Sequence, residues 1–564
     1  MKLSRVLAAS ALLCWCFALS MPAREPVRAR KAMVVAQEPI AADVGVAVLK
    51  AGGNAIDATV AVALALAVTH PSAGNLGGGG FILVRMADGR TSFIDFREMA
   101  PRSASRNMYI GPDGKATGDS MVGWRAAGVP GTVRGLEFAH KKLGRKSWGE
   151  LVQPSVELAA KGVTLSYAEA RGLCGTRKLL EQFPESKRIF LNGGTCFEAG
   201  DRLVQPELAE VLRRIGRDGA KDFYEGQTAR ILADEMKKHG GEITLEDLKG
   251  YAVVERKPIT GRYRGYDIIT APPPSSGGVG MLEMMGMLDG TGYEKAGAGS
   301  AATTHFMAEV MRRYYADRAE FLGDPDFVKM PVKGLISKAY TEKLRTGIDP
   351  SKATPSSSLH AGKAFDYEST ETTHFNIVDE QGNAVAMTYT INGSYGNGVT
   401  VPRLGFLLNN EMDDFAAKPG EANMFGLVQG EANAIQPLKR PLSSMTPTIV
   451  LKDGELHMVV GAPGGSRIIS GVTQVVLYVL DFGMNVQQAI DQPRLHHQWM
   501  PDKLYLERGF SPDTRALLEQ RGHKVEETSG VASVEAIMVE KTSDGKRWLA
   551  GAQNGHSAGK AAGY

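Results

Sequence analysis

One stretch, 55-AIDATVAVALALAVTH-70, is almost wholly alanine, valine and leucine, so the helix that it predicts has no polar face. Gly52-Gly53 ends a preceding helix, Asn54 is placed to cap this one, and Pro71 stops it. A helix that is apolar on every side is stable only where other elements cover it all round. The chain must therefore enclose this helix in a layered structure.

Segments with strand patterns lie both close to this helix and far from it in the sequence. An early hairpin joins FILVRM to TSFIDF through Asp88-Gly89. Later strand pairs are predicted over 374–391, over 446–461 around a Lys452-Asp453-Gly454 turn, and over 534–550. Strand pairs that alternate with long buried helices predict a layered α/β sandwich.

Helical periodicity dominates the region from about 120 to 360, for example in 303-TTHFMAEVMRRYYADRAEF-321, and returns in the apolar segment 467–483. Two segments interrupt this region. We expect 271-APPPSSGGVG-280 to be extended, because it is rich in proline and glycine, and the Ser-rich segment 351–368 to be a polar loop.

The charge balance limits the partners of the chain. A formal net charge of +3 on 564 residues is close to neutral. Nucleic acid as the main partner would need a concentrated basic face. We therefore expect no nucleic-acid partner.

The first 23 residues read as an export signal. Lys2 and Arg5 precede a short apolar run, Val6 to Leu19, and small residues around 18–20 or Ala23 offer cleavage sites. A retained N-terminal anchor is the alternative, although the apolar run is short for a membrane span. The prediction is a periplasmic or secreted protein without membrane contact once the leader, with Cys14 and Cys16, has been removed.

Two cysteines remain in the mature chain, Cys174 and Cys196, separated by 22 residues. In an oxidising compartment such a pair is predicted to form a disulfide, with two free buried thiols as the alternative. The chain has no Cys-X-X-Cys motif and no His/Cys spacing typical of zinc sites, so we expect no metal.

The segment 371-ETTHFNIVDEQGNAVAMTYTING-393 offers a nucleophile. A threonine hydroxyl needs a base, and an N-terminal threonine can use its own α-amino group, whose pKa is near 8. Thr372 lies between a polar, Ser-rich segment and a predicted strand, where cleavage after Glu371 would make it N-terminal. The plain alternative is that Thr372 is an ordinary strand residue.

The turn 461-GAPGGSR-467 follows a strand and opens a helix, so its backbone N–H groups point toward a common anion. The Walker and dinucleotide-binding patterns are both absent. Gly464 and Gly465 are therefore candidates for an oxyanion site, and a plain tight turn is the alternative.

Four other side chains could recognise an amino acid. Arg97 can clamp a carboxylate and Asp414 can pair with an ammonium, while Ser443 and Ser444 offer donors in a loop that we expect to be exposed. Taken singly, each is more often a surface salt bridge, a cap or a turn residue. Together with the nucleophile they suit an amino acid whose side-chain acyl group is attacked.

Long motifs in one order now point to a family. AGGNAIDA, THPSAGNLGGGGF, DFREMAP, PPPSSGG, TTHFNIVDEQGNAVAMTYTING, NNEMDDF, RPLSSMTPTIV, GAPGGSRII and the terminal AGY occur between about residue 28 and Tyr564. In these motifs the chain resembles the γ-glutamyltranspeptidases (glutathione hydrolases) of the N-terminal-nucleophile hydrolase superfamily, and it looks most like their bacterial periplasmic members.

The resemblance implies an α+β fold, a four-layer αββα sandwich built as one composite core. It implies a proenzyme that cleaves itself between Glu371 and Thr372. The large subunit would be 24–371 and the small subunit 372–564, and the two would remain associated as a heterodimer.

The resemblance also implies a role for each site residue. Thr372 would attack the γ-carbonyl of glutathione or a related γ-glutamyl compound, and water, an amino acid or a peptide would accept the acyl group without any cofactor. The implied catalytic residues are Thr372, Thr390, Gly464 and Gly465. The implied substrate-binding residues are Arg97, Ser443 and Ser444 at the α-carboxylate, Asn392, Glu411 and Asp414 around the α-amino group, and Thr390 and Gly465 beside the nucleophile.

Two positions depart from the pattern of some family members. Position 411 is Glu where some bacterial members have Gln. In 419-PGEANMFGLVQG-430, which resembles the lid loop over the site, Phe425 stands where some members have Tyr. A hydrogen bond from that hydroxyl to Asn392 is therefore not possible here.

Three other functions are alternatives. A cephalosporin or glutaryl acylase has the same architecture but can dispense with the charged partners of an α-amino-acid head group, whereas Arg97 and Asp414 are both kept here. A γ-linked polyglutamate depolymerase differs in the size of its substrate. An exported amino-acid-binding protein without catalysis is the third, and the Thr372/Thr390 pair argues against it.

Overall fold

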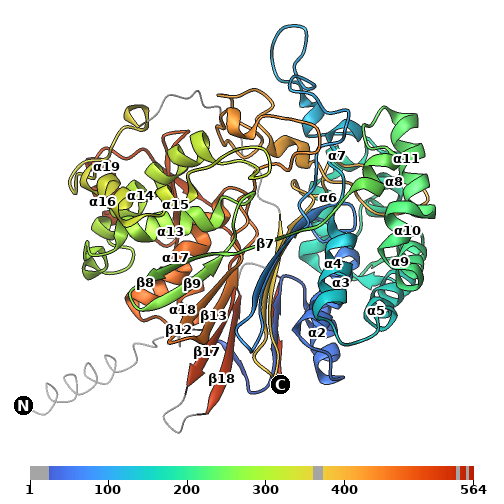
Figure 1. Cartoon of the computed structure of the whole chain (residues 1–564), viewed down its shortest axis with the longest axis horizontal. Coiled ribbons are helices and arrows are strands. Elements are labelled where there is room, and N and C mark those ends of the chain that lie inside the picture. Colours follow the sequence, from blue (N-terminus) through green and yellow to red (C-terminus); the bar gives the residue numbers. More distant parts are fainter. Residues whose placement is uncertain (1–23, 360–371, 542–545, 554–557) are drawn as a thin grey trace, which may run out of the picture.

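Four layers make up the fold in the computed structural model, which describes residues 24–359, 372–541, 546–553 and 558–564. Two antiparallel sheets pack face to face, and helices cover the outer face of each sheet (Figure 1). The αββα sandwich predicted from the sequence is confirmed. The predicted leader over 1–23 and the residue Glu371 lie outside the described residues.

The first sheet runs in the order β1-β18-β17-β13-β12-β9-β8. Its described strands are β1 (Val27–Ala29), β8 (Ile259–Tyr263), β9 (Tyr266–Thr270), β12 (Thr448–Lys452), β13 (Glu455–Gly461), β17 (Glu535–Lys541) and β18 (Arg547–Gln553).

The second sheet runs in the order β19-β2-β10-β11-β3-β4-β7. Its described strands are β2 (Met33–Ala36), β3 (Gly79–Arg85), β4 (Thr91–Asp95), β7 (Val254–Arg256), β10 (Thr373–Val378), β11 (Ala384–Thr390) and β19 (Lys560–Gly563). Both sheets therefore combine strands from before residue 371 with strands from after it. Two small sheets lie outside the sandwich: β5 (Val163–Thr164) with β6 (Arg202–Leu203), and β14 (Leu495–His496), β15 (Leu504–Glu507) and β16 (Val525–Thr528).

Helices from the first half of the chain cover the second sheet, on the right of Figure 1. They are α2 (Pro39–Lys50), α3 (Ala55–Thr69), α4 (Thr132–Leu143), α5 (Trp148–Lys161), α6 (Tyr167–Gly175), α7 (Arg177–Leu180), α8 (Pro184–Phe190), α9 (Pro206–Asp218), α10 (Ala220–Glu225), α11 (Gln227–His239) and α12 (Leu245–Gly250). The first sheet is covered by α13 (Gly277–Leu288), α14 (Ala301–Phe321), α15 (Val332–Leu335), α16 (Lys338–Thr346), α17 (Arg467–Phe482), α18 (Val486–Asp491) and α19 (Pro512–Gln520).

The apolar helix of the opening segment is α3, and every one of its residues is buried. Asn54 caps it in a capping box with Asp57, each side chain accepting a backbone N–H of the other residue. Because side chains alternate along a strand, Ile82 and Val84 of β3 join the core that contains α3, while Phe81 and Leu83 join the core between the sheets. Other elements therefore cover α3 on every side, as an all-apolar helix requires.

The predicted hairpins at 81–96, 374–391, 446–461 and 534–550 and the helix at 467–483 are confirmed. One prediction was partly wrong. The segment 271–280 is not extended throughout, because Gly277 to Gly280 form the first turn of α13. There Gly278 packs against the carbonyl of Ala271, which leaves no room for a side chain.

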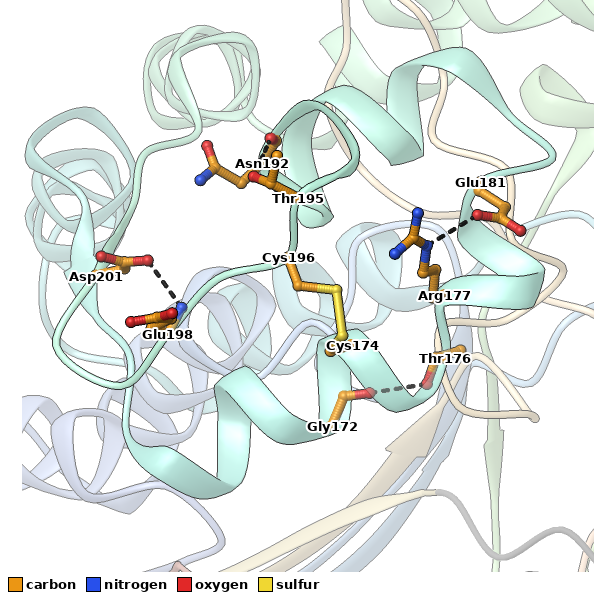
Figure 2. Close-up of a disulfide and its surroundings, with 10 residues drawn as sticks. All are labelled: Gly172, Cys174, Thr176, Arg177, Glu181, Asn192, Thr195, Cys196, Glu198 and Asp201. Carbon is orange, nitrogen blue, oxygen red and sulfur yellow. Dashed lines mark hydrogen bonds and ion pairs between the residues drawn. A yellow bond between two sulfur atoms is a disulfide. The ribbon is translucent and has the colours of Figure 1, made fainter.

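Cys174, in α6, and Cys196, in the loop before β6, form a disulfide with their Cα atoms 5.5 Å apart (Figure 2). The bond ties the end of α6 to a loop rich in polar side chains.

The last residue of the chain is fixed beside the first strands. The carbonyl oxygen of Tyr564 accepts the backbone N–H groups of Arg30, Lys31 and Ala32, at 3.1, 2.7 and 3.4 Å. Among the described residues, no helix combines the length and the apolar character that crossing a bilayer requires.

Candidate active site

The two threonines predicted to act together lie side by side on adjacent strands. Thr372 immediately precedes β10 and is 5% exposed, and its hydroxyl is 3.4 Å from the hydroxyl of Thr390 at the end of β11. The hydroxyl oxygen of Thr390 also accepts the N–H of Asn392 at 2.8 Å. Thr390 is therefore oriented by the chain that follows it.

The glycine run 77–80 supports this pair from behind. A Cβ on Gly78 would lie 2.0 Å from the carbonyl oxygen of Thr390, and a Cβ on Gly80 would lie 2.3 Å from that of Thr388. Asn75 completes the contact by donating its side-chain amide to the Thr390 carbonyl at 2.9 Å. Only residues without a side chain allow β3 and its preceding loop to approach β11 so closely.

The glycine turn leads from β13 to α17. Gly464 and Gly465 have φ values of +138° and +54°, in a region that other residues rarely adopt. Gly465 lines the same pocket as Thr372, whereas Gly464 packs its α-carbon against Ala532 and is not part of the pocket wall.

One small pocket brings most of the predicted site residues together. Its lining consists of Arg97, Thr372, Thr390, Asn392, Glu411, Asp414, Phe425, Leu427, Ser443, Ser444, Met445, Gly465, Ser466 and Ile468. Of the residues predicted from the sequence, Gly464 lies just behind this wall and Glu371 is outside the described residues.

A charged cluster lines part of the same pocket. Arg97 is fully buried and donates through its two terminal nitrogens to Glu411 and Asp414. Its Nη1 also lies 3.5 Å from Glu98, whose side chain is fully buried. Three carboxyl groups thus surround one guanidinium.

Burial and mutual repulsion make these carboxyl groups hard to ionise together. Burial raises the pKa of Glu411 well above its usual range and raises that of Asp414, although Arg97 opposes both shifts. Burial likewise raises the pKa of Glu98 to about 7. The cluster is therefore short of positive charge, which an ammonium group would supply.

The loop with the two serines differs from its prediction. Ser443 is buried, not exposed, because the segment 272–276 covers it. Ser276 donates both its backbone N–H and its hydroxyl to the Ser443 carbonyl, at 2.8 and 2.7 Å. The cover comes from a segment about 170 residues earlier in the chain, so local sequence could not reveal it.

Arg318, which the sequence did not single out, supports this loop. It is buried in α14 and donates to the hydroxyls of Ser276 and Ser444, at 3.0 and 3.3 Å. Arg318 lies in the last turn of α14, where a basic residue is common, so the local sequence offered no sign of this role.

Outside this pocket, the described residues contain one group with metal-ligand chemistry: His305, Glu309 and His523. The two imidazoles are hydrogen-bonded to each other at 2.8 Å. Glu309 is paired with Arg312 and Arg313, at 3.3 and 2.7 Å. These contacts make the group part of a structural network, in which the carboxylate serves two arginines.

Comparisons with known proteins agree with this geometry. The family model of gamma-glutamyltranspeptidase matches residues 41–564. A glutathione hydrolase proenzyme of Escherichia coli (strain K12) is 50% identical over 519 residues, covering 91% of this chain and 89% of that protein.

Among solved structures, a cephalosporin acylase from Bacillus halodurans shares the fold over 97% of this chain and 98% of its own, with a TM-score of 0.85 and 25% identity. The gamma-glutamyltranspeptidase of Helicobacter pylori is 44% identical, with a TM-score of 0.57 over 58% of this chain and 94% of that chain. Since the family match extends over most of the sequence, the chain belongs to the gamma-glutamyltranspeptidase family.

Proposed function

We propose that this protein is an autoprocessing enzyme that cleaves the γ-glutamyl amide bond of glutathione and related compounds. It transfers the acyl group to water or to the amine of an amino acid or peptide. One observation carries the proposal: a paired threonine and a cluster made for an α-amino-acid head group line the same pocket. The identity with glutathione hydrolase proenzymes supports it.

The first reaction frees the nucleophile. The Thr372 hydroxyl attacks the carbonyl of Glu371, the peptide C–N bond breaks, and the acyl group moves to oxygen as an ester. Hydrolysis of that ester releases the Glu371 carboxylate and leaves Thr372 with a free α-amino group. With a pKa near 8, this amine is partly neutral at working pH and can take the proton of the hydroxyl beside it.

Catalysis then uses the same oxygen. Thr372 Oγ1 attacks the γ-carbonyl, its proton passes to the α-amino group, and Thr390 holds the hydroxyl in position. Backbone N–H groups of the turn at Gly464 and Gly465 stabilise the oxyanion. The leaving amine takes the proton, and water or a second amine releases the acyl group by the reverse steps.

The charged cluster selects the substrate. Arg97, with Ser443 and Ser444, binds the α-carboxylate, while Glu411, Asp414 and Asn392 surround the α-ammonium. A glutaryl side chain lacks that ammonium and would leave the surplus of buried carboxylates unbalanced. This favours γ-glutamyl compounds over the substrates of a glutaryl acylase.

Two subunits, 24–371 and 372–564, follow from this mechanism. Since both sheets contain strands from both parts, neither part contains a complete core, and the halves stay together as a heterodimer. A leader over residues 1–23 would direct the precursor to the periplasm or out of the cell.

A denaturing gel tests the proposal. Purified wild-type protein should give two bands of about 37 and about 21 kDa, in proportion to 60.5 kDa for 564 residues. Thr372→Ala should give one uncleaved band, because it lacks the attacking oxygen. Wild-type protein should release glutamate from a chromogenic γ-glutamyl anilide, and the variant should not.

The conservative variant Thr373→Ser serves as the control, since position 373 is buried in the adjacent strand and has no role in the reaction. Cleavage at residue 371 that persists in Thr372→Ala would disprove the mechanism.

A further inference from the structure

The lid loop, residues 416–430, is folded over the pocket as a narrow hairpin. Gly420 N–H donates to the Gln429 carbonyl at 2.9 Å, and Asn423 N–H donates to the Leu427 carbonyl at 3.1 Å. At the tip, the side chains of Phe425 and Leu427 are buried and line the pocket that contains Thr372. The loop is therefore in a closed position.

The other side of the tip borders a second hollow, lined by Ala422, Asn423 and Met424 together with residues of the segment 116–121. Met424 also contacts the active-site pocket, since its sulfur accepts the side-chain amide of Asn392 at 3.5 Å. Hydrogen bonds to the backbone of the tip add to this packing.

Gln498 provides one of these bonds and extends it to the glycine turn. This buried residue follows β14 and donates Nε2 to the carbonyl of Phe425 at 3.1 Å. Its Oε1 accepts the hydroxyl of Ser466, at 2.8 Å, directly after the glycine turn. A single amide side chain therefore joins the lid tip to the candidate oxyanion site.

The surroundings of Gln498 fix the direction of its amide group. Oε1 faces two donors, the Ser466 hydroxyl and His496 Nε2 at 2.9 Å. Nε2 faces two acceptors, the carbonyls of Phe425 and Met500 at 3.1 and 3.4 Å. Reversing the amide would set its oxygen against the carbonyls of Phe425 and Met500, which can only accept, so neither a carboxylate nor an apolar side chain can replace it.

Asp413 holds the neighbouring peptide of the tip. Its Oδ2 accepts the N–H of Met424 at 3.0 Å, and its Oδ1 accepts the hydroxyl of Ser120 at 2.8 Å. Two consecutive lid residues, Met424 and Phe425, are therefore held through their backbones by buried side chains on two different segments. The tip needs no side-chain hydroxyl at position 425 to stay closed.

We propose that Gln498 is a positioning residue that holds the lid closed through the backbone of Phe425 and couples lid closure to the glycine turn. The proposal rests on the proposed function, in which this pocket binds the γ-glutamyl group. In this chain Gln498 takes over the anchoring that a hydroxyl at position 425 cannot provide. Substrate retention, and with it the share of acyl groups taken by water, then depends on Gln498.

Hydrogen–deuterium exchange of the processed wild-type enzyme and two variants tests the anchoring without any need for activity. Gln498→Met removes the hydrogen bonds with the Phe425 carbonyl and with the Ser466 hydroxyl. Gln498→Glu keeps the acceptor for Ser466 but sets an oxygen against the Phe425 carbonyl. Since one hydrogen bond contributes about a factor of ten, amides of residues 420–428 should exchange about tenfold faster in both variants. Residues 462–468 should exchange faster only in Gln498→Met.

Kinetics provide the second readout. For a γ-glutamyl anilide, KM should rise about fivefold to tenfold in both variants while kcat changes less than threefold, because Gln498 does not touch the reacting atoms. The ratio of hydrolysis to transfer should increase, since an open lid admits water. Gln227→Glu, which makes the same chemical change at an exposed position, should match wild type.

Unchanged exchange over 420–428 in both variants would overturn the proposal. So would an increase spread evenly over the chain, because Gln498 would then support the fold rather than the lid. A wild-type enzyme that fails to cleave γ-glutamyl compounds would instead refute the proposed function, and the exchange result would stand separately.

Discussion

At the scale of single residues, the pocket is organised around one guanidinium. Arg97 neutralises part of a group of three carboxyls, two buried and one partly buried, and at the same time is the proposed partner of the substrate carboxylate. It therefore contributes to folding as well as to binding. Its planar fork matters, because it serves Glu411 and Asp414 on two separate nitrogens.

Arg97→Lys should separate the two contributions. Lysine keeps the positive charge, so processing should continue, but a point charge cannot replace the fork, and KM for a γ-glutamyl anilide should rise about tenfold or more. Arg97→Ala should lose about 3–5 kcal/mol of stability, because it leaves buried carboxylates without a partner. Steady-state kinetics and thermal unfolding measure both effects.

The exposed position Arg217 offers a matched control, and Arg217→Lys should change neither quantity. A normal KM in Arg97→Lys would show that the fork does not recognise the substrate.

The residue scale also shows where the sequence was sufficient. The candidate nucleophile, its threonine neighbour and the charged partners belong to contiguous motifs, and the pocket collects them. Arg318 and Gln498 were missed, because the partners that give them their roles lie in other segments, 32 to 126 residues away, and neither belongs to a recognisable local pattern. The exposed loop expected at Ser443 was wrong for the same reason: a distant segment covers it.

At the scale of elements, local rules predicted the helices and hairpins well. Alternation, turn residues and caps act within a few positions, so β10, β11 and α3 follow from their own sequences. The glycine run 77–80 is different. Its cause is the backbone of β11 and of residue 407, more than 300 positions later. Sequence marked these glycines as unusual but could not say what they touch.

Gly78→Ala should therefore disturb the nucleophile from behind. Its Cβ would meet the Thr390 carbonyl oxygen at 2.0 Å, so β11 must shift, at a cost of about 1–3 kcal/mol for overpacking. We expect self-processing to slow at least tenfold, followed on a denaturing gel over time. A misplacement of the catalytic pair by a fraction of an ångström is sufficient for such a loss.

Gly175→Ala is the matched control, since a Cβ there meets nothing within 4 Å. Processing of Gly78→Ala at the wild-type rate would show that the close packing of the run is not needed for the reaction.

At the scale of the whole molecule, buried histidines link the fold to pH. Burial lowers the pKa of His374, His496 and His523 to about 3 and that of His70 and His497 to about 4. In the unfolded chain these groups titrate near 6.5. Below that pH these histidines bind protons in the unfolded state but not in the folded state. Their contribution to the free energy of unfolding is therefore fully present above about pH 6.5 and is lost as the pH falls toward 4.

Urea unfolding of the uncleaved variant Thr372→Ala between pH 8 and 5 measures this contribution. Each histidine contributes a slope of up to about 1.4 kcal/mol per pH unit below 6.5. Burial raises the pKa of Glu98 to about 7 and raises those of Glu283, Glu411 and Glu535 well above their usual range. These carboxyls act in the opposite direction, because their stabilisation is lost as the pH rises, so the histidine contribution is isolated by removing one histidine.

Adding His374→Gln to this variant should remove the contribution of about one proton to the slope of the free energy of unfolding against pH, below pH 6.5. A pH dependence of stability that is the same with and without His374→Gln would contradict the assignment of a neutral buried imidazole at position 374.

The contact between Tyr564 and residues 30–32 has a topological consequence. It brings the last residue beside the first strands, while the proposed cut opens the chain at Thr372 in the middle of its sequence. The processed enzyme would therefore resemble a circular permutant in which hydrogen bonds, and no covalent bond, hold the two old ends together. A gene reordered to begin at Thr372, with a short linker from Tyr564 to the first strand, would preserve every strand pairing and would start with the threonine that the natural precursor must first release.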